Sequence, residues 1–312
     1  MSRACRVCLE DVALAGEAPY HERCLEGLFG ISKLPAIDIE LAKLHTLALA
    51  MVGHTTISGV QRKISAGLSN DKTTLQVALE GGRFILKPQA HTYPRLPENE
   101  HLTMRLARLA GIEIPPCGLV PLADGSLAYV VARFDRPPDG GKLRQEDFCQ
   151  LAEKAPKEKY DGSAELCVRL LRQYASEPLI EMLELYRRLV FIWWTGNGDM
   201  HLKNFSLLAG RDGLQRLSPA YDLLCTRLVI PDDPLALPVQ GKKDRLDRAA
   251  WLALAAYGRI GAKAAERVLA SFGGVLEAAV RLVARSELPE EMKAGYEALL
   301  RERMRTLQAQ AN

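Results

Sequence analysis

The most informative segment of the sequence is Asn197-Gly198-Asp199-Met200-His201-Leu202-Lys203-Asn204. It follows a dense apolar run at residues 189–194, which predicts the end of a buried helix. The segment offers a carboxylate, an imidazole, an ammonium group and two carboxamides. Phosphoryl transfer needs a carboxylate that orients the attacking hydroxyl, a carboxamide oxygen that binds Mg²⁺, and a cation near the phosphates. The segment therefore predicts phosphoryl-transfer chemistry.

The spacing within and after this segment matches that of protein kinases. The interval from Asp199 to Asn204 is that of a kinase catalytic loop, in which the Asp is the base and the Asn binds metal. Two short strands are then predicted at residues 205–208 and 215–218, and Asp222 follows them. A kinase carries its second metal-binding aspartate after a short hairpin downstream of the catalytic loop. We therefore expect Asn204 and Asp222 to be the Mg²⁺ ligands.

Upstream, the pattern predicts a loop followed by strands, the last of which carries a lysine. The loop spans residues 54–63 and contains Gly59. The expected strands are residues 63–68, 74–79 and 83–88. A small-residue loop can fold over nucleotide phosphates, and Lys87 at the end of the last strand can reach them. The alternative for Lys87 is a solvated lysine at a strand end.

A helix is predicted from Pro97 to the glycine at position 111. In a kinase, the helix after the lysine strand carries the glutamate that pairs with that lysine. Glu98 and Glu100 are both candidates for this partner. The alternative is that these acids serve only the helix dipole.

The exit from a predicted hairpin, at residues 118–122 and 126–131, is the strongest linker signal in the chain. It runs through Ala132, Arg133 and Phe134 into a stretch rich in Pro and Gly. The backbone of such a hinge strand can hydrogen-bond adenine, so these three residues are expected at the base. Beyond the hinge the pattern becomes helical. The expected helices are residues 146–151, 164–174, 179–195 and, with a break at Pro289, the region 249–312.

The N-terminal region carries a pattern of metal ligands. Cys5 and Cys8 form a C-x₂-C pair, and His21 and Cys24 form an H-x₂-C pair shortly after it. Three thiolates and one imidazole would close a tetrahedron around a structural Zn²⁺, with no open position for catalysis. The alternative is four unrelated side chains.

Composition excludes several classes of protein. The net charge is only +3, from 41 basic and 38 acidic residues, so no global basic field predicts direct nucleic-acid binding. The apolar runs are shorter than a membrane helix needs, and the N-terminus lacks the core of a signal peptide. Seven cysteines, an odd number, favour a reducing compartment. We expect a soluble cytoplasmic protein. The cluster of Lys242, Lys243, Arg245 and Arg248 is expected to be a solvated face, with a phosphate or partner contact as the alternative.

Taken together, these motifs resemble the HipA-type serine/threonine kinases, the toxins of bacterial toxin–antitoxin modules. The residues that carry the match are 58–63, 84–88, 98–100, 133–136, 145–150, 197–205 and 221–222. The chain is similar to the short HipT branch, because it lacks the subdomain that precedes the phosphate loop in the full-length toxin. The Cys/His pattern departs from that of the family.

The resemblance implies a role for each matching residue. Asp199 would be the catalytic base, Lys87 would bind the ATP phosphates, and Asn204 and Asp222 would bind Mg²⁺. The other residues implied at the nucleotide are Ser58, Gly59, Val60, Gln61, Lys63, Gln145, His201, Lys203 and Tyr221. Kinases of this family phosphorylate a serine in their own phosphate loop, and Ser58 matches it, with Thr56 as the neighbouring hydroxyl. That phosphate would switch the enzyme off by charge repulsion.

The resemblance also implies partners and a fold. The substrates would be aminoacyl-tRNA synthetases, and the partners a HipB-like helix-turn-helix antitoxin and a small HipS-like protein, with DNA bound only through the antitoxin and no membrane contact. We expect an α+β, two-lobed, protein-kinase-like fold. Its parts would be a zinc-knuckle-like element at residues 1–31, a β-rich N-lobe at 32–138 and a mainly helical C-lobe at 139–312.

Two other functions are compatible with parts of the pattern. Small-molecule kinases, such as those for aminoglycosides and choline, also use an Asp-to-Asn catalytic loop. A non-catalytic, antitoxin-bound co-repressor would not need an intact site. The presence of all of Lys87, Asp199, Asn204 and Asp222 argues against it.

Overall fold

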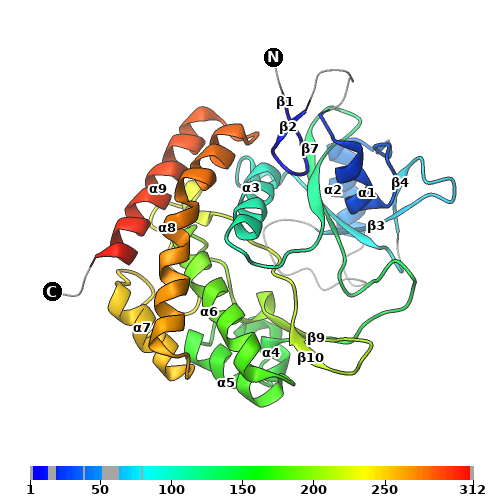
Figure 1. Cartoon of the computed structure of the whole chain (residues 1–312). Coiled ribbons are helices and arrows are strands. Elements are labelled where there is room, and N and C mark those ends of the chain that lie inside the picture. Colours follow the sequence, from blue (N-terminus) through cyan, green and yellow to red (C-terminus); the bar gives the residue numbers. More distant parts are fainter. Residues whose placement is uncertain (1–2, 13–18, 38, 51–62, 79, 310–312) are drawn as a thin grey trace. The chain divides into compact units, whose positions relative to one another are not determined.

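The computed structural model describes residues 3–12, 19–37, 39–50, 63–78 and 80–309 (Figure 1). The chain divides into two compact units. Unit 1 comprises Met1–Arg105, Pro115–Phe134 and Ala284–Leu288, and unit 2 comprises Leu106–Ile114, Asp135–Val283 and Pro289–Asn312. Within the described residues, none of the helices is both long enough and apolar enough to cross a bilayer.

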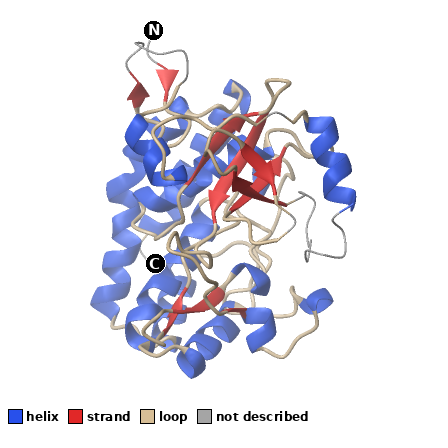
Figure 2. Ribbon diagram, turned by 90° about the vertical axis from the view of Figure 1, so that its right-hand side faces the viewer, coloured by secondary structure: helices blue, strands red, loops and turns tan. Residues whose placement is uncertain are grey.

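Unit 1 is built on a five-stranded antiparallel sheet, visible as the larger group of arrows in Figure 2. The strands, in their order across the sheet, are β4 (Leu75–Val77), β3 (Ile64–Leu68), β5 (Phe84–Pro88), β7 (Leu127–Ala132) and β6 (Cys117–Pro121). The middle strand β5 is largely buried, as its apolar sequence predicts. It pairs with β7 so that Lys87 lies opposite Tyr129. The sheet thus holds Lys87 in a fixed register.

The N-terminal segment packs into the same core as the sheet. It forms β1 (Arg3–Ala4), β2 (Asp11–Val12) and α1 (Glu22–Phe29), followed by α2 (Leu41–Ala50). The helix α1 ends at Gly30, whose left-handed backbone (φ 76°) suits a residue without a Cβ. Its apolar face is buried, and the ring of Phe29 lies 5.3 Å from that of Phe84 in β5. The N-terminal segment therefore shares one hydrophobic core with the strands.

The helix α3 (Leu96–Leu109) follows β5 in the chain. The side-chain oxygen of Gln89 accepts a hydrogen bond from the first backbone N–H of α3, at 3.2 Å, and satisfies one of its unpaired donors. Residues 98–104 are all buried, including the polar Glu98, Asn99, Glu100 and His101. Buried polar groups require partners, so this end of α3 is held by specific contacts rather than by apolar packing alone.

Unit 2 is mainly helical. Its α-helices are α4 (Phe148–Leu151), α5 (Ala164–Tyr174), α6 (Pro178–Trp194), α7 (Arg248–Tyr257), α8 (Ala262–Arg285, whose last two residues cluster with unit 1) and α9 (Glu290–Gln308). The central helix α6 is buried through its C-terminal half. There the ring centre of Trp194 lies 5.3 Å from that of Phe272, and the ring centre of Trp193 lies 5.7 Å from that of Trp251. This buried helix delivers the polar segment 197–204.

A small sheet lies beside that segment. It consists of β10 (Gln215–Leu217), β9 (Ser206–Ala209) and β8 (Gln145–Asp147), all antiparallel. The sequence-based helix at residues 146–151 is therefore wrong at its start. Gln145 pairs with Leu208 as a strand, and Asp147 caps the short helix α4 through a reciprocal pair of hydrogen bonds with Gln150. Residues 145–147 form a strand because they pair with β9, although their local sequence favours a helix.

Candidate active site

The polar segment is held in a tight turn immediately after α6. Gly196 ends the helix with a left-handed backbone (φ 70°). The N–H of Gly198 donates to the Thr226 hydroxyl at 2.7 Å, and a Cβ at Gly198 would clash with the carboxylate of Asp233. The Asn197 side-chain oxygen accepts from the N–H of Asp199 at 3.1 Å. These contacts fix the backbone that carries the Asp199 carboxylate.

The two ends of the Asp-to-Asn motif lie against each other. Residues Leu202–Asn204 form one turn of 3₁₀ helix, which brings the chain back toward Asp199. The Asn204 amide donates to the backbone carbonyl of Asp199 at 3.1 Å. The remaining oxygen of that carboxamide is the atom type that binds Mg²⁺. Asp199 and Asn204 are thus brought together as their spacing predicted.

Asp199 has a partner that the sequence did not predict. The phenol of Tyr160 donates to its Oδ1 at 2.7 Å. Burial, together with this hydrogen bond and the Asp199 charge, raises the pKa of Tyr160, so the phenol stays protonated and remains a donor. Tyr160 lies 39 residues upstream, in a segment between predicted helices, and no local pattern marks it.

His201 is buried beside this pair. Its ring meets that of Tyr160 edge-on, with centroids 5.1 Å apart. Burial lowers the pKa of His201 to about 4, although the charges of Asp199 and Asp222 act in the opposite direction. The imidazole is therefore neutral near pH 7. Its Nδ1 and the amide nitrogen of Asn197 are both buried without a hydrogen-bond partner among the described residues, which suits a site that receives a polar ligand.

Lys203 and Tyr221 join the loop to the small sheet. The Lys203 ammonium forms an ion pair with Asp147, 2.7 Å long. The Tyr221 hydroxyl donates to the Lys203 backbone carbonyl at 3.0 Å, and burial raises the pKa of Tyr221. The following residue, Asp222, has a left-handed backbone (φ 56°) and a half-buried side chain. Such a backbone is uncommon for residues other than Gly, and Asp and Asn adopt it more readily than most.

A buried serine, Ser206, connects several predicted site residues and was missed from the sequence. The side-chain amide of Gln145 lies 2.9 Å from the Ser206 hydroxyl oxygen, and the Tyr221 hydroxyl lies 3.1 Å from it. Ser206 in turn donates to Ser218 at 3.0 Å. Ser206 therefore accepts from Gln145 and donates to Ser218, whereas the Tyr221 hydroxyl already donates its single proton to the Lys203 carbonyl. Ser206 fixes Gln145 and Tyr221 relative to each other.

Unit 1 contains a buried ion pair formed by Lys87. The Lys87 ammonium lies 2.5 Å from the Glu100 carboxylate, and the two side chains are only 4% and 2% exposed. The ammonium also lies 5.5 Å from the centre of the Tyr129 ring. Glu98 pairs instead with Arg95, at 2.9 Å. Of the two candidate partners for Lys87, the structure selects Glu100, and Lys87 is not a solvated strand-end lysine.

The remaining residues predicted at the nucleotide are those of the phosphate loop and the hinge. Thr56, Ser58, Gly59, Val60 and Gln61 lie outside the described residues. Lys63 is half-buried just before β3. Ala132 is the last residue of β7, and the N–H of Arg133 donates to the Arg83 carbonyl at 2.8 Å. Phe134 is the last residue of the second segment of unit 1.

The predicted metal ligands at the N-terminus lie together. The ligand atoms of Cys5, Cys8, His21 and Cys24 are all within 4.8 Å of one another. His21 Nδ1 lies 3.4 Å from the Cys8 sulfur and 3.7 Å from the Cys24 sulfur. A hydrogen bond from the Cys8 thiol and several backbone N–H groups lower the pKa of Cys5, against the effect of burial.

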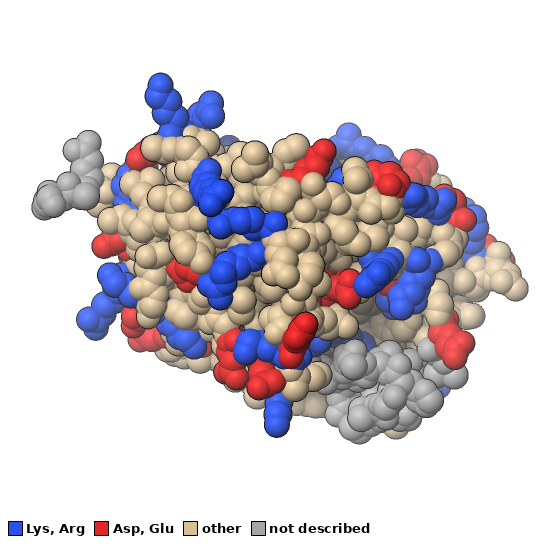
Figure 3. Space-filling view, turned by 90° about the horizontal axis from the view of Figure 1, so that it is seen from below, with Lys and Arg blue, Asp and Glu red and all other residues tan. Residues whose placement is uncertain are grey.

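The predicted basic cluster is largely a solvated face. Lys242, Lys243 and Arg245 are exposed, and Arg248 forms an ion pair with Glu266. Acidic side chains lie among them. Asp244 and Asp247 line a hollow of about 560 Å³ in unit 2, together with Lys243 and Arg245. On the face of the molecule shown in Figure 3, blue and red side chains are likewise interspersed. The basic residues of this cluster thus alternate with acids instead of forming a continuous basic patch.

Comparison with known proteins identifies the family. Residues 55–282 match the family model of the HipA-like C-terminal domain. The "Putative kinase Y4dM" of Sinorhizobium fredii is 40% identical over 187 residues, which are 55% of this chain and 45% of that protein. The "Serine/threonine-protein kinase toxin HipA" of Shewanella oneidensis is 26% identical over 188 residues, 54% of this chain and 42% of that protein. The matched segment spans about half the length of such relatives.

Solved structures give the fold. A chain in the Shewanella oneidensis MR-1 complex of HipA, HipB and operator DNA superposes with a TM-score of 0.69 at 17% identity, covering 98% of this chain and 78% of that one. The Helicobacter pylori proinflammatory kinase CtkA superposes with a TM-score of 0.52 at 12% identity, covering 79% of this chain and 90% of that one. The predicted kinase-like α+β fold is confirmed.

Proposed function

The chain belongs to the family of the HipA-like C-terminal domain, and from that membership we propose that it is a Mg·ATP-dependent serine/threonine protein kinase and the toxin of a toxin–antitoxin system. The expectation of this family from the sequence motifs is thereby confirmed. The activity, the substrate and the partners are the proposal, and they rest on the side chains described above.

In the proposed reaction, Asp199 accepts the proton of the substrate hydroxyl as that oxygen attacks the γ-phosphate of ATP. The Tyr160 hydrogen bond supports this role, because it orients the carboxylate through one oxygen and leaves the other for the substrate. The phenol carries no charge, so the base is not neutralised by an ion pair. Asn204 and Asp222 supply a carboxamide oxygen and a carboxylate, the ligands that Mg²⁺ prefers. When bound, Mg²⁺ neutralises charge on the phosphates.

Lys87 is proposed to bind the ATP phosphates, with Glu100 positioning its ammonium. The observation that carries this proposal is the buried Lys87–Glu100 pair. The desolvation penalty of burying two charges often exceeds the attraction between them. A buried ion pair is therefore weak evidence for a stabilising role. Active kinases require a lysine–glutamate pair of this kind.

The remaining nucleotide contacts follow from the family resemblance. We propose Ser58, Gly59, Val60, Gln61 and Lys63 at the phosphates. Ala132, Arg133 and Phe134 are proposed at the adenine, and Gln145, His201, Lys203 and Tyr221 along the rest of the nucleotide. Because His201 is neutral near pH 7, its contribution would be a hydrogen bond rather than a positive charge.

Self-modification and partners complete the proposal. Phosphorylation of Ser58, or of Thr56 beside it, would place about two negative charges next to the nucleotide phosphates and inactivate the enzyme. The proposed targets are aminoacyl-tRNA synthetases in the cytoplasm. The relative from Shewanella oneidensis was solved with HipB and operator DNA, which supports a HipB-like antitoxin here. A HipS-like protein is the second proposed partner, and DNA would be bound only through the antitoxin.

The test is phosphate transfer from labelled ATP to a bacterial protein extract and, separately, to a pool of metabolites. We expect label in proteins with the wild-type chain and none with Asp199→Asn. Asp139→Asn is the matched control, since Asp139 is an exposed acid of unit 2 whose carboxylate pairs with Arg211 at 2.6 Å. Label in metabolites alone would establish a small-molecule kinase. Absence of any ATP turnover would favour the non-catalytic co-repressor.

A further inference from the structure

The Cys/His cluster has the geometry of a closed zinc site. A tetrahedral ion with Zn–S bonds of about 2.3 Å and Zn–N bonds of about 2.0 Å holds its sulfur and nitrogen ligands roughly 3.5 Å apart. The two sulfur-to-Nδ1 distances at His21, 3.4 and 3.7 Å, match this value. The Nε2 of His21 lies 3.1 Å from the Asp11 carbonyl and therefore donates to it. That hydrogen bond turns the Nδ1 lone pair toward the sulfurs, as in other zinc-binding histidines.

The turn between the first two ligands faces the rest of unit 1. Its two middle residues, Arg6 and Val7, each use the backbone carbonyl as an acceptor. The Arg6 carbonyl accepts from the N–H of Leu119 in β6 at 2.8 Å. The approach is close, because a Cβ at Gly118 would lie 2.9 Å from the Val7 side chain and 3.0 Å from the Arg6 carbonyl. Glycine at position 118 allows the turn to rest directly on the strand.

The Val7 carbonyl contacts α3. It lies 3.1 Å from Nε2 of His101, which is completely buried. Burial lowers the pKa of His101 to about 4, so the ring is neutral and Nε2 carries the proton that it donates. His101 directly follows Glu100, the residue that pairs with Lys87. The hydrogen bond between His101 and Val7 therefore joins the Cys5–Cys8 turn to the turn of α3 that carries Glu100.

From these contacts we propose that Cys5, Cys8, His21 and Cys24 bind one Zn²⁺ ion, and that the turn closed by this ion positions α3 for the Lys87–Glu100 pair. Two of the four ligands flank Arg6 and Val7, so the ion fixes the direction of both carbonyls. Without it, the turn is closed by the hydrogen bond between the Cys8 and Cys5 thiols and by the one from the Leu9 N–H to the Cys5 carbonyl, 2.8 Å long, and two metal–sulfur bonds would hold it more firmly. His101 is a positioning residue in this proposal, because it acts through its neighbour.

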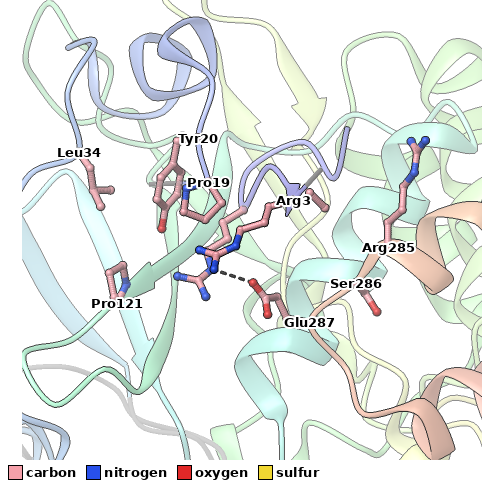
Figure 4. A pocket seen from close by; sticks show the side chains of 10 residues that line it. Arg3, Pro19, Tyr20, Leu34, Pro121, Arg285, Ser286 and Glu287 are labelled. Carbon is pink, nitrogen blue, oxygen red and sulfur yellow. Dashed lines mark hydrogen bonds and ion pairs between the residues drawn. The ribbon is translucent and has the colours of Figure 1, made fainter. Parts of the chain in front are cut away.

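Ion pairs with residues 284–288 also hold the segment that carries the metal ligands. Arg6 forms an ion pair with Glu287, 2.8 Å long, and Arg285 pairs with Glu10 and Asp11. A hollow of about 530 Å³ lies beside these residues. Figure 4 shows Tyr20 along its wall and Glu287 at the end of the dashed line. The Tyr20 hydroxyl donates to the Leu119 carbonyl at 2.9 Å. The metal ligands are thus flanked by fixed contacts, as expected for a structural site.

The first test is the metal content of the purified full chain. We expect one zinc per chain by elemental analysis, and its loss in Cys24→Ser. Cys149→Ser is the control, since Cys149 is a buried cysteine of unit 2 that lies outside the cluster. Reconstitution with Co²⁺ is expected to give the absorption of a tetrahedral thiolate site. A chain that contains no zinc, and gives no such absorption with Co²⁺, overturns the metal site.

The second test separates the positioning of α3 from metal binding and from kinase activity. Hydrogen exchange at residues 98–105 of α3 is expected to accelerate about tenfold or more when zinc is removed, because a buried hydrogen bond is lost. Exchange in α6 is expected to stay unchanged. His101→Leu is expected to keep its zinc and yet show the same acceleration of exchange. His101→Gln retains a side-chain N–H donor, so its exchange is expected to accelerate less than that of His101→Leu. This readout does not require the proposed function to be correct.

Only the consequence for catalysis rests on the proposed function, since a displaced Glu100 would weaken ATP binding by Lys87. Zinc loss that leaves the exchange of α3 unchanged would overturn the positioning role, even if the metal site itself is confirmed.

Discussion

Two carboxylates of this protein, Glu100 in unit 1 and Asp199 in unit 2, are held in opposite ways. Glu100 is buried and directly paired with the Lys87 ammonium. Asp199 is half-exposed, and its closest described side-chain partner is the uncharged phenol of Tyr160. A carboxylate that is fully neutralised by a cation is a poor proton acceptor. The difference indicates that Glu100 orients a cation, whereas Asp199 keeps its capacity to take a proton from a substrate.

The largest effect outside Asp199 itself is expected for Asp222→Asn. Asn tolerates the left-handed backbone of this position, so the substitution removes mainly the charge. Phosphate transfer is expected to fall by about 10²- to 10³-fold, with a higher Mg²⁺ concentration needed for half-maximal rate. The measurement is the rate as a function of Mg²⁺ concentration. Asp212→Asn, on the exposed hairpin, is the control, and an unchanged Mg²⁺ dependence in Asp222→Asn would remove Asp222 from the metal site.

The next effect tests the role of Glu100. We expect Glu100→Gln to weaken ATP binding about tenfold, because Lys87 loses the charge that orients it. Glu98→Gln is the matched control, since Glu98 is equally buried but pairs with Arg95. The measurement is ATP affinity by calorimetry. Equal effects of the two substitutions would show that the acids serve the helix rather than Lys87.

A smaller effect is expected for Tyr160→Phe. Loss of one hydrogen bond to the base should lower kcat by about two- to tenfold, while the KM for ATP stays the same. Tyr174→Phe, a change at another partly exposed tyrosine of unit 2, should have no effect. A rise in the KM for ATP without a change in kcat would place Tyr160 at the nucleotide instead of at the base.

The smallest effect concerns stability rather than activity. The pKa of buried His201 is about 4, whereas an unfolded histidine titrates near 6.5. Below about pH 6.5 the unfolded chain therefore binds the proton and the folded chain does not, so the unfolding free energy falls as the pH drops toward 4. This contribution is about 1.4 kcal/mol per pH unit.

His201→Asn is expected to remove that part of the pH dependence between about pH 7 and about pH 5.5. Substitution of the exposed His91 by Asn serves as the control. The measurement is denaturant unfolding at both pH values. If His201→Asn retains the full wild-type slope, the imidazole is not the group that titrates.

Local patterns predicted much of this molecule. The strand that carries Lys87, the Asp199-to-Asn204 turn and the clustering of Cys5 and Cys8 with His21 and Cys24 all depend on residues close in sequence, whose spacing alone limits the geometry. The choice between Glu98 and Glu100 depends on the packing of α3. Glu98 lies in the first turn of that helix and Glu100 only two residues further on, and sequence alone does not give the rotation of the helix relative to β5.

The missed features are all contacts over long sequence separations. Tyr160 reaches Asp199 from 39 residues away, and Ser206 joins Gln145 to Tyr221 across the small sheet. The strand β8 exists because β9 pairs with it, although its own residues read as the start of a helix. No pattern within a window of a few residues contains this information.

The most direct test of the central claim is peptide mass spectrometry of the purified chain after incubation with Mg·ATP, beside Asp199→Asn. The account predicts phosphate on the segment that contains Thr56 and Ser58 in the wild type and none in the variant, with both chains folded alike. Equal phosphorylation of the two proteins would contradict the role of Asp199. A wild-type chain that gains no phosphate, transfers none to any protein and consumes no ATP would contradict the assignment as a kinase.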